Sequence, residues 1–175
     1  MNRPRVSVFL GVSLDGYIAG ESDDLSWLSI VQTDPPEDTG YEALMREVDV
    51  LVLGRNTYEK VLTFGDWPYH GKRVIVLTHH ALYPRHGEEA HGGDLCALLA
   101  ELGAAGHAHV YLDGGMAVRD GLAAGVVDTL TLSWVPVILG QGTALFGVGM
   151  PTSKWRLVSS RAFPSGLVQA RYQPV

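Results

Sequence analysis

The residues best suited to chemistry form a short turn, Asp113-Gly114-Gly115, which follows a β-rich run and precedes a helical pattern. Adjacent glycines adopt backbone angles that residues with a Cβ avoid. A strand that passes through such a turn into a helix points free backbone N–H groups and the positive end of the helix dipole at one place. That arrangement suits a phosphate, although an ordinary tight strand-to-helix turn explains the isolated motif equally well.

Two further strand ends carry residues that bind ligands, in Gly54-Arg55 and in Thr78-His79. Ligands of open α/β sheets bind where several strand C-termini meet, so these ends favour a dinucleotide site. The Gly114-Gly115 turn would hold the pyrophosphate. Arg55 would bind a 2′-phosphate, because its planar guanidinium matches phosphate oxygens, and Thr78 and His79 would complete that pocket.

Other chemistries fit the sequence poorly. The first βα turn lacks GxGxxG, and neither a phosphate-loop Lys-Ser/Thr motif nor a Gly-x-Ser-x-Gly elbow occurs. The histidine pairs His79-His80 and His107-x-His109 lack the helical spacing and carboxylate company of a zinc site. We therefore expect no metal.

Composition narrows the class of protein. The chain has 175 residues, 46% of them hydrophobic and 18% charged, which fits one globular α/β domain over residues 1–175. A net charge of -6 argues against nucleic acid as a partner, and no apolar run reaches bilayer length. Cys96 is the single cysteine, so no disulfide forms within the chain and a cytoplasmic location is expected.

The hydrophobic pattern predicts alternating strands and helices followed by a β-rich tail. It indicates an α/β fold with a mixed, mostly parallel sheet flanked by helices and a C-terminal antiparallel hairpin. Helix-start signals lie at residues 32–36, with Thr33 or Asp34 as the N-cap. Strands are expected at residues 5–12, 49–53, 73–78, 109–113, 126–138, 155–163 and 167–173, with further helices opening near Gly54, Asp94 and Met116.

Several motifs in this order resemble the dihydrofolate reductase-like superfamily. The branch that looks most similar is the reductase domain of the bifunctional riboflavin-biosynthesis deaminase–reductase, and the resemblance covers nearly the whole chain. The zinc signature of the deaminase half is missing. The motifs are Ser13-Leu14-Asp15-Gly16-Tyr17-Ile18-Ala19, Gly54-Arg55-Asn56-Thr57-Tyr58-Glu59, Asp113-Gly114-Gly115, Val127-Asp128 and residues 136–146.

The resemblance implies an NADPH-dependent oxidoreductase, similar to 5-amino-6-(5-phosphoribosylamino)uracil reductase. Hydride would pass to a small heterocyclic or ribosylaminopyrimidine-like substrate, and the nicotinamide would lie near residues 12–18. The cofactor-binding residues implied are Val12, Ile18, Gly54, Arg55, Asn56, Thr57, Leu77, Thr78, His79, Gly114, Gly115, Met116, Ala117 and Val118.

Asp113 matches the position of a family carboxylate that faces the substrate, so it is a candidate for both catalysis and substrate binding. Asp15 is the second catalytic candidate. The structural alternatives are a strand-end cap for Asp113 and a turn-stabilising role for Asp15. Residues 22–29 could cover a pocket and present Trp27 to the substrate, or Trp27 could pin this loop to the core.

Folate reduction is an alternative activity. Glu37 and Asp38 lie about where folate reductases carry a carboxylate, but Lys72 stands where they place an arginine that clamps the substrate. A lysine offers no bidentate fork, which disfavours folate. A non-catalytic NADP-binding module and a flavin-type reductase are further alternatives. Residues 126–173 are a candidate homodimer surface, because an open sheet edge tends to be paired.

Overall fold

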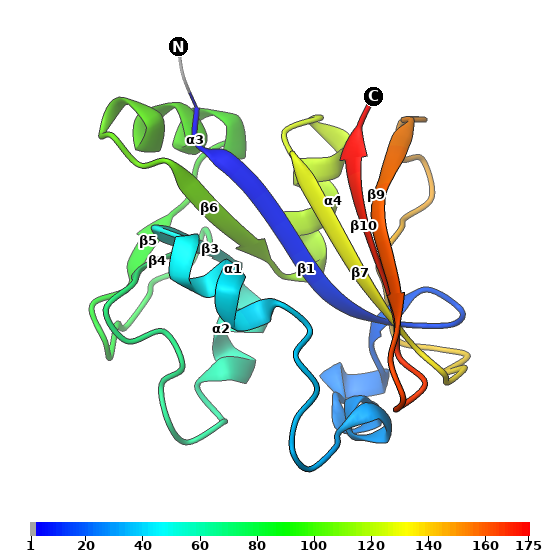
Figure 1. Cartoon of the computed structure of the whole chain (residues 1–175). Coiled ribbons are helices and arrows are strands. Elements are labelled where there is room, and N and C mark those ends of the chain that lie inside the picture. Colours follow the sequence, from blue (N-terminus) through cyan, green and yellow to red (C-terminus); the bar gives the residue numbers. More distant parts are fainter. Residues whose placement is uncertain (1–2) are drawn as a thin grey trace.

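The computed structural model describes residues 3–175, in which ten strands form two sheets (Figure 1). The larger sheet has eight strands in the order β5-β4-β3-β6-β1-β7-β10-β9, and β2 pairs with β8 in the smaller one. The bounds are β1 Arg5–Ser13, β2 Tyr17–Ala19, β3 Val50–Gly54, β4 Arg73–Leu77, β5 Glu89–His91, β6 His109–Asp113, β7 Thr129–Val135, β8 Thr143–Ala144, β9 Trp155–Ala162 and β10 Val168–Pro174.

The large sheet is parallel from β5 through β7 and antiparallel at its C-terminal edge. Strand β1 runs parallel to both β6 and β7, while β10 runs antiparallel to β7 and β9. The predicted mixed, mostly parallel sheet with a C-terminal antiparallel hairpin is therefore confirmed.

Helices cover both faces of the sheet, and residue alternation along the strands explains why. In β3, Val50 and Val52 pack into one apolar cluster with α3 and α4, while Leu51 and Leu53 pack into a second with α1 and α2. A strand buried on both faces reads as a continuous apolar run. The helices are α1 Tyr41–Glu47, α2 Arg55–Val61, α3 Leu95–Ala104 and α4 Gly115–Ala123, with 3-10 helices η1 Glu21–Asp23 and η2 Ser26–Val31.

Two predicted boundaries are wrong. The first α-helix begins at Tyr41, after Gly40 with φ 82°, and not at the Thr33 or Asp34 cap. The Thr33 hydroxyl instead donates to the carbonyl of Pro35. Strand β7 is shorter than the apolar run at 126–138 at both ends, since it begins at Thr129 and ends directly before Pro136, which has no N–H for the ladder.

Because β1, β3, β4 and β6 run parallel, this topology places their C-terminal ends side by side, along the edge of the sheet at which these strands end. That edge faces down in Figure 1. Within residues 3–175, no helix has the length and apolar character needed to cross a membrane.

Candidate active site

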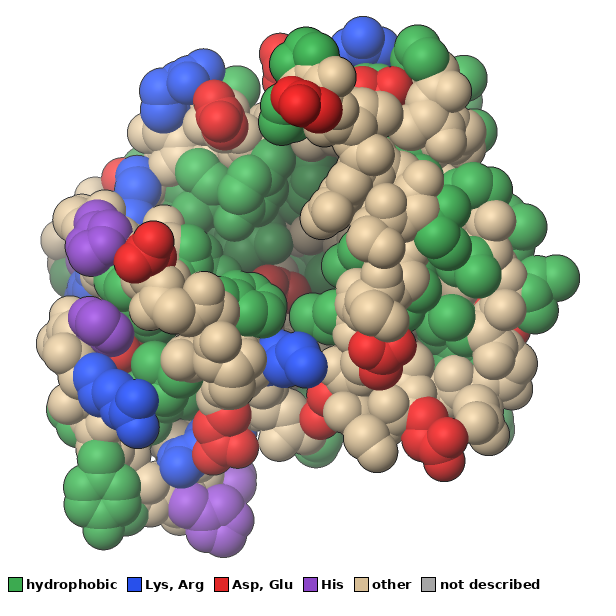
Figure 2. Space-filling view, turned by 90° about the horizontal axis from the view of Figure 1, so that it is seen from below, with side chains coloured by type: hydrophobic (Ala, Val, Ile, Leu, Met, Phe, Trp, Pro, Cys, Tyr) green, Lys and Arg blue, Asp and Glu red, His purple; other side chains and the backbone are tan. Residues whose placement is uncertain are grey.

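A cavity of about 630 Å³ opens at this edge of the sheet. Figure 2 looks into it and shows a hollow walled largely by apolar side chains, with acidic and basic groups near its rim. Its walls come from the ends of β1, β3, β4 and β6, from the first turns of α2 and α4, and from the loop that contains η1. The three strand ends singled out in the sequence thus meet around one cavity.

The two glycine turns lie against each other. A Cβ built on Gly114 would lie 2.8 Å from Oγ1 of Thr57 and 3.1 Å from the backbone N of Gly54. Gly114 also has φ 108°, which side chains with a Cβ rarely adopt. Both observations require glycine at position 114, and they join the starts of α2 and α4 into one surface.

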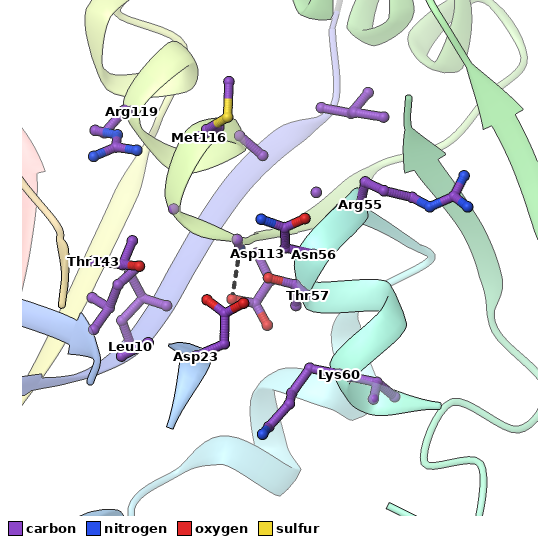
Figure 3. Close-up of a pocket in the computed structure, with 18 of the residues that line it drawn as sticks. Leu10, Asp23, Arg55, Asn56, Thr57, Lys60, Asp113, Met116, Arg119 and Thr143 are labelled. Carbon is purple, nitrogen blue, oxygen red and sulfur yellow. Dashed lines mark hydrogen bonds between the residues drawn. The ribbon is translucent and has the colours of Figure 1, made fainter. Parts of the chain in front are cut away.

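The N-terminus of α4 faces the cavity without a side-chain cap. Its first turn therefore offers backbone N–H groups to an anion. Arg119 lies on the same side of the helix, because its Nη2 is 3.9 Å from a Cβ built on Gly115 and its Nη1 donates to Ala144 O at 3.0 Å. Figure 3 shows Arg119 and Met116 on α4 at the rim of the cavity.

Sequence reasoning missed Arg119. Its spacing could have predicted a place in the site. Arg119 stands four residues after Gly115, and therefore about one helical turn along the same face.

Arg55 occupies the opposite corner of the cavity. Its Nη1 donates to Ala81 O at 3.0 Å and lies 3.4 Å from Oγ1 of Thr78. Its Nε pairs with Glu59 at 2.7 Å, one turn further along α2. His79 lines the same corner. The predicted grouping of Arg55, Thr78 and His79 is thus present, with Glu59 holding the guanidinium in place.

Asp113 is half-buried at the end of β6, where Gly114 N–H donates to its Oδ1 at 2.8 Å. Burial raises the pKa of Asp113 from 3.8 to about 6, and this outweighs the opposing effect of that hydrogen bond. The neighbouring Tyr69 and Tyr111 also have raised pKa values, first through burial and then through the charge of Asp113. Asp113 can therefore hold a proton at near-neutral pH.

Asp15 does not line the cavity. Its carboxylate accepts hydrogen bonds from Ser13 Oγ at 2.6 Å, Leu139 N at 3.1 Å and Gly140 N at 2.7 Å. These bonds, led by the one from Ser13, lower the pKa of Asp15. The geometry favours the structural alternative, in which Asp15 ties the β1–β2 turn to the loop at 139–140.

Trp27 also lies away from the cavity. It is buried against Val135, Phe163 and Leu167, and its indole N–H donates to Asp24 O at 3.1 Å. The geometry again favours the structural alternative, because Trp27 pins its loop to the core. The loop itself does reach the cavity, through Asp23, Leu25 and Leu28.

Most of the predicted cofactor-binding residues line the cavity. Val12 and Val118 are the exceptions, since both are fully buried behind the wall. The residues that line it are Ile18, Gly54, Arg55, Asn56, Thr57, Leu77, Thr78, His79, Gly114, Gly115, Met116 and Ala117.

The residues considered for folate chemistry are engaged elsewhere. Glu37 accepts hydrogen bonds from the backbone N–H and the hydroxyl of Ser165, in the C-terminal hairpin. Nζ of Lys72 donates to Val48 O at 2.6 Å, at the end of α1. Neither Glu37, Asp38 nor Lys72 lines the cavity, so the structure offers no support for the folate alternative.

Other lining residues were not anticipated. They include Phe9 and Leu10 on β1, Asp23 in η1 and Lys60 on α2. Their sequence signals are weak, because a loop aspartate or a helix lysine is common on any surface. Across the described residues 3–175, no group of three His, Cys, Asp or Glu side chains is placed to hold a metal ion.

Residues 4–169 match the family described as the RibD C-terminal domain. The uncharacterized protein YwjB of Bacillus subtilis (strain 168) is 31% identical, covering 94% of this chain and 95% of that protein. The structure of a candidate riboflavin biosynthesis protein from Shewanella sp. PV-4 is 35% identical, with a TM-score of 0.91 and coverage of 98% and 99% of the two chains.

A Thermotoga maritima structure extends the likeness of fold. It is a diaminohydroxyphosphoribosylaminopyrimidine deaminase/5-amino-6-(5-phosphoribosylamino)uracil reductase, 18% identical with a TM-score of 0.70. The match covers 99% of this chain and 57% of that one.

Proposed function

Because the chain belongs to the RibD C-terminal domain family, whose members are reductase-like, we propose that it is an NADPH-dependent reductase of a small heterocyclic substrate. The observation that carries this proposal is a single cavity with an ordered set of groups. Arg55 lies at one end of the cavity, and the uncapped start of α4 lies in the middle. Asp113 lies beside the part of the cavity that is lined by apolar side chains. A dinucleotide needs groups in this spatial order, because its phosphates and its rings lie one after another along its length.

The residues present fit NADPH. Gly114 packs directly on Gly54 and Thr57, which brings the starts of α2 and α4 together at the cavity, and the first turn of α4 with Arg119 supplies donors and charge for the pyrophosphate. Arg55 with Thr78 would hold the 2′-phosphate. Within residues 3–175 nothing bonds to the buried Nε2 of His91 at the same end of the cavity. A polar ligand would provide its partner.

NADPH supplies a hydride when bound, and the chain's own residues would prepare the acceptor. Ile18 lies at the middle of the cavity, against Gly115, where it can support the nicotinamide. The apolar wall, including Phe9 and Tyr69, excludes water and holds a flat acceptor. Asp113 would hold a proton at its carboxyl oxygen beside the acceptor.

The first test is cofactor preference, measured by calorimetric titration. We expect the protein to bind NADPH more tightly than NADH. Replacing Arg55 with glutamine should weaken NADPH binding by about tenfold or more, because a charge-assisted contact to phosphate is lost, while leaving NADH within about twofold. Arg46→Gln, on the exposed side of α1, is the matched control. Equal affinity for the two nucleotides in the unmutated protein contradicts the role of Arg55.

Turnover separates the remaining alternatives. Tight NADPH binding with no oxidation by pterin, pyrimidine or flavin acceptors would identify a binding module. A yellow purified protein would identify a flavin-type reductase.

We also propose that the protein is a homodimer through its C-terminal strands. Strand β9 ends the large sheet and pairs only with β10 among the described strands, so its outer backbone groups are open. Leu157 and Val158 are exposed on this edge strand, at 53% and 40%, and Val168 of the adjoining β10 is exposed at 44%. Open apolar edges are usually covered by another chain.

A further inference from the structure

We propose that the acceptor end of the cavity selects a flat molecule without a phosphate group, and that Asp23 is the residue that excludes phosphorylated acceptors. The acceptor end is the part lined by Phe9, Leu25, Leu28, Phe64 and Tyr69, together with Asp23, Lys60 and Asp113. This inference rests on the proposed function, because it concerns the molecule that would receive the hydride.

Charge is divided unevenly along the cavity. The charged lining residues are Arg55, Arg119 and Asp120 at the cofactor end, and Asp23, Lys60 and Asp113 at the acceptor end. Both arginines thus lie where the cofactor's phosphates would bind. The acceptor end holds two carboxylates and one lysine.

The carboxylates face the space that the acceptor would occupy. In Figure 3, the side chains of Asp23 and Asp113 point toward one another, whereas the Lys60 side chain extends away from Asp113. A phosphate dianion here would meet the exposed carboxylate of Asp23, and that of half-buried Asp113 whenever Asp113 is ionised, whereas Lys60 is the one cationic side chain among the described residues that line this end. A neutral or basic molecule would find acceptors for its N–H groups instead.

The backbone holds Asp23 in this position. Ser22 and Asp23 have φ of 55° and 58°, in the left-handed region that side chains with a Cβ rarely adopt. The turn is closed by Gly20 N–H, which donates to Asp24 O at 2.8 Å. Asp23 lines the cavity, whereas the carboxylate of the next residue, Asp24, does not line it and accepts a hydrogen bond from the Ser26 hydroxyl.

This charge pattern marks a difference from the phosphoribosyl substrate named for the Thermotoga maritima relative, with which the chain shares the fold. A phosphoribosyl group needs cationic or backbone donors at its phosphate. Among the described residues that line the acceptor end, Lys60 is the one cationic side chain. The relevant molecule is therefore a nucleobase-like or nucleoside-like acceptor rather than a nucleotide.

Two matched pairs of acceptors test the proposal, riboflavin with FMN, and 5-amino-6-ribosylaminouracil with its 5′-phosphate. Each pair differs only in one phosphate. Affinity is measured by titration into protein saturated with NADP⁺, and turnover by NADPH oxidation. We expect the unphosphorylated member to bind about tenfold more tightly or better in at least one pair at low ionic strength, since the carboxylates repel a phosphate dianion and salt screens this repulsion least there.

Substitutions locate the cause of the preference. Asp23→Asn should bring the two members of a pair to within about threefold, because it removes one repulsive charge and keeps the shape. Glu101→Gln, which makes the same charge change on the exposed side of α3, should leave the preference unchanged. Lys60→Gln should not weaken binding of the phosphorylated member selectively.

The proposal is overturned if a phosphorylated member binds equally or more tightly, if Lys60→Gln selectively weakens it, or if neither unphosphorylated member binds. Failure of the proposed function looks different. If the proposed function is wrong, NADPH itself does not bind. The preference for the unphosphorylated acceptor can still be measured in that case, by titration into the protein without nucleotide.

Discussion

At the scale of single residues, the candidate site depends on what burial does to one carboxyl group. Asp113 lies in a β6 position where its neighbours on the same face are aromatic, and water is largely replaced by Tyr69 and Tyr111. Losing hydration disfavours the charged form, and this is why its pKa lies near 6. An acid with this pKa can deliver a proton at a pH where cells work.

The first prediction concerns the pH dependence of turnover. If protonated Asp113 donates to the substrate, kcat should fall about tenfold per pH unit above about 6, because the acid form is lost. Asp113→Asn should lower kcat, flatten this limb of the profile and leave NADPH affinity nearly unchanged. Steady-state kinetics from pH 5 to about 8.5 provide the measurement, and an unchanged limb in the variant would rule out Asp113 as the proton donor.

The same substitution should stabilise the protein. The pKa of Asp113 is raised on folding, so its contribution to stability is present below 3.8 and is lost as the pH rises through about 6. At pH 8 the neutral asparagine avoids this loss, and the free energy of unfolding should rise by roughly 1–3 kcal/mol. Urea denaturation at pH 8 and at pH 4 tests the sign, because the gain should nearly vanish at the lower pH.

At the scale of elements, regular strands and the turns between them were predictable, and long-range contacts were not. Strands β3, β4 and β6 have apolar runs that end in glycine or polar residues, so their bounds agree closely with the expected ranges. The short strands β2, β5 and β8 were missed. Two or three residues carry no periodicity, and their pairing depends on partners far along the chain.

The same distinction explains the site residues. Arg55 and Gly114 are adjacent to strand ends, and their place follows from the topology of parallel sheets. Asp15 sits in a turn and Trp27 in the short 3-10 helix η2, and the surroundings of both are set by residues more than a hundred positions away, such as Gly140 and Phe163. A loop residue's neighbours cannot be read from its own segment.

Asp15 links two loops that are far apart in the sequence, so its replacement should affect both. Because its carboxylate joins the β1–β2 turn to the loop at 139–140, Asp15→Asn should lower the melting temperature and raise KM through disorder of both loops. It should keep the pH profile set by Asp113. Asp66→Asn, at an exposed position, is the control for the change of charge. A lost pH limb with normal thermal stability would instead make Asp15 the proton donor.

At the scale of the whole molecule, the sheet has two unlike edges. The β5 edge is short, with three residues, whereas β9 offers eight residues with an almost entirely exposed face. Short edges limit pairing between chains, and long ones invite it. For the proposed homodimer, this contrast favours association through the C-terminal hairpin over association through β5.

Light scattering tests this association. We expect a mass of two chains for the unmutated protein and of one chain for Val158→Lys, because a charge on the exposed β9 edge opposes pairing. Val148→Lys, at a fully exposed position outside β9, should leave the mass unchanged. A single-chain mass for the unmutated protein, over a range of concentrations, would contradict the dimer.

The position of β1 in the sheet bears on how the chain is made in the cell. Strand β1 is synthesised before its neighbours, yet Ser7 pairs with Tyr111 of β6 and with Thr129 of β7. While the ribosome extends the chain through the residues between, the apolar run of β1 has neither partner. The nascent protein thus exposes an aggregation-prone segment until late in translation, and chaperones that recognise such segments should bind this chain there.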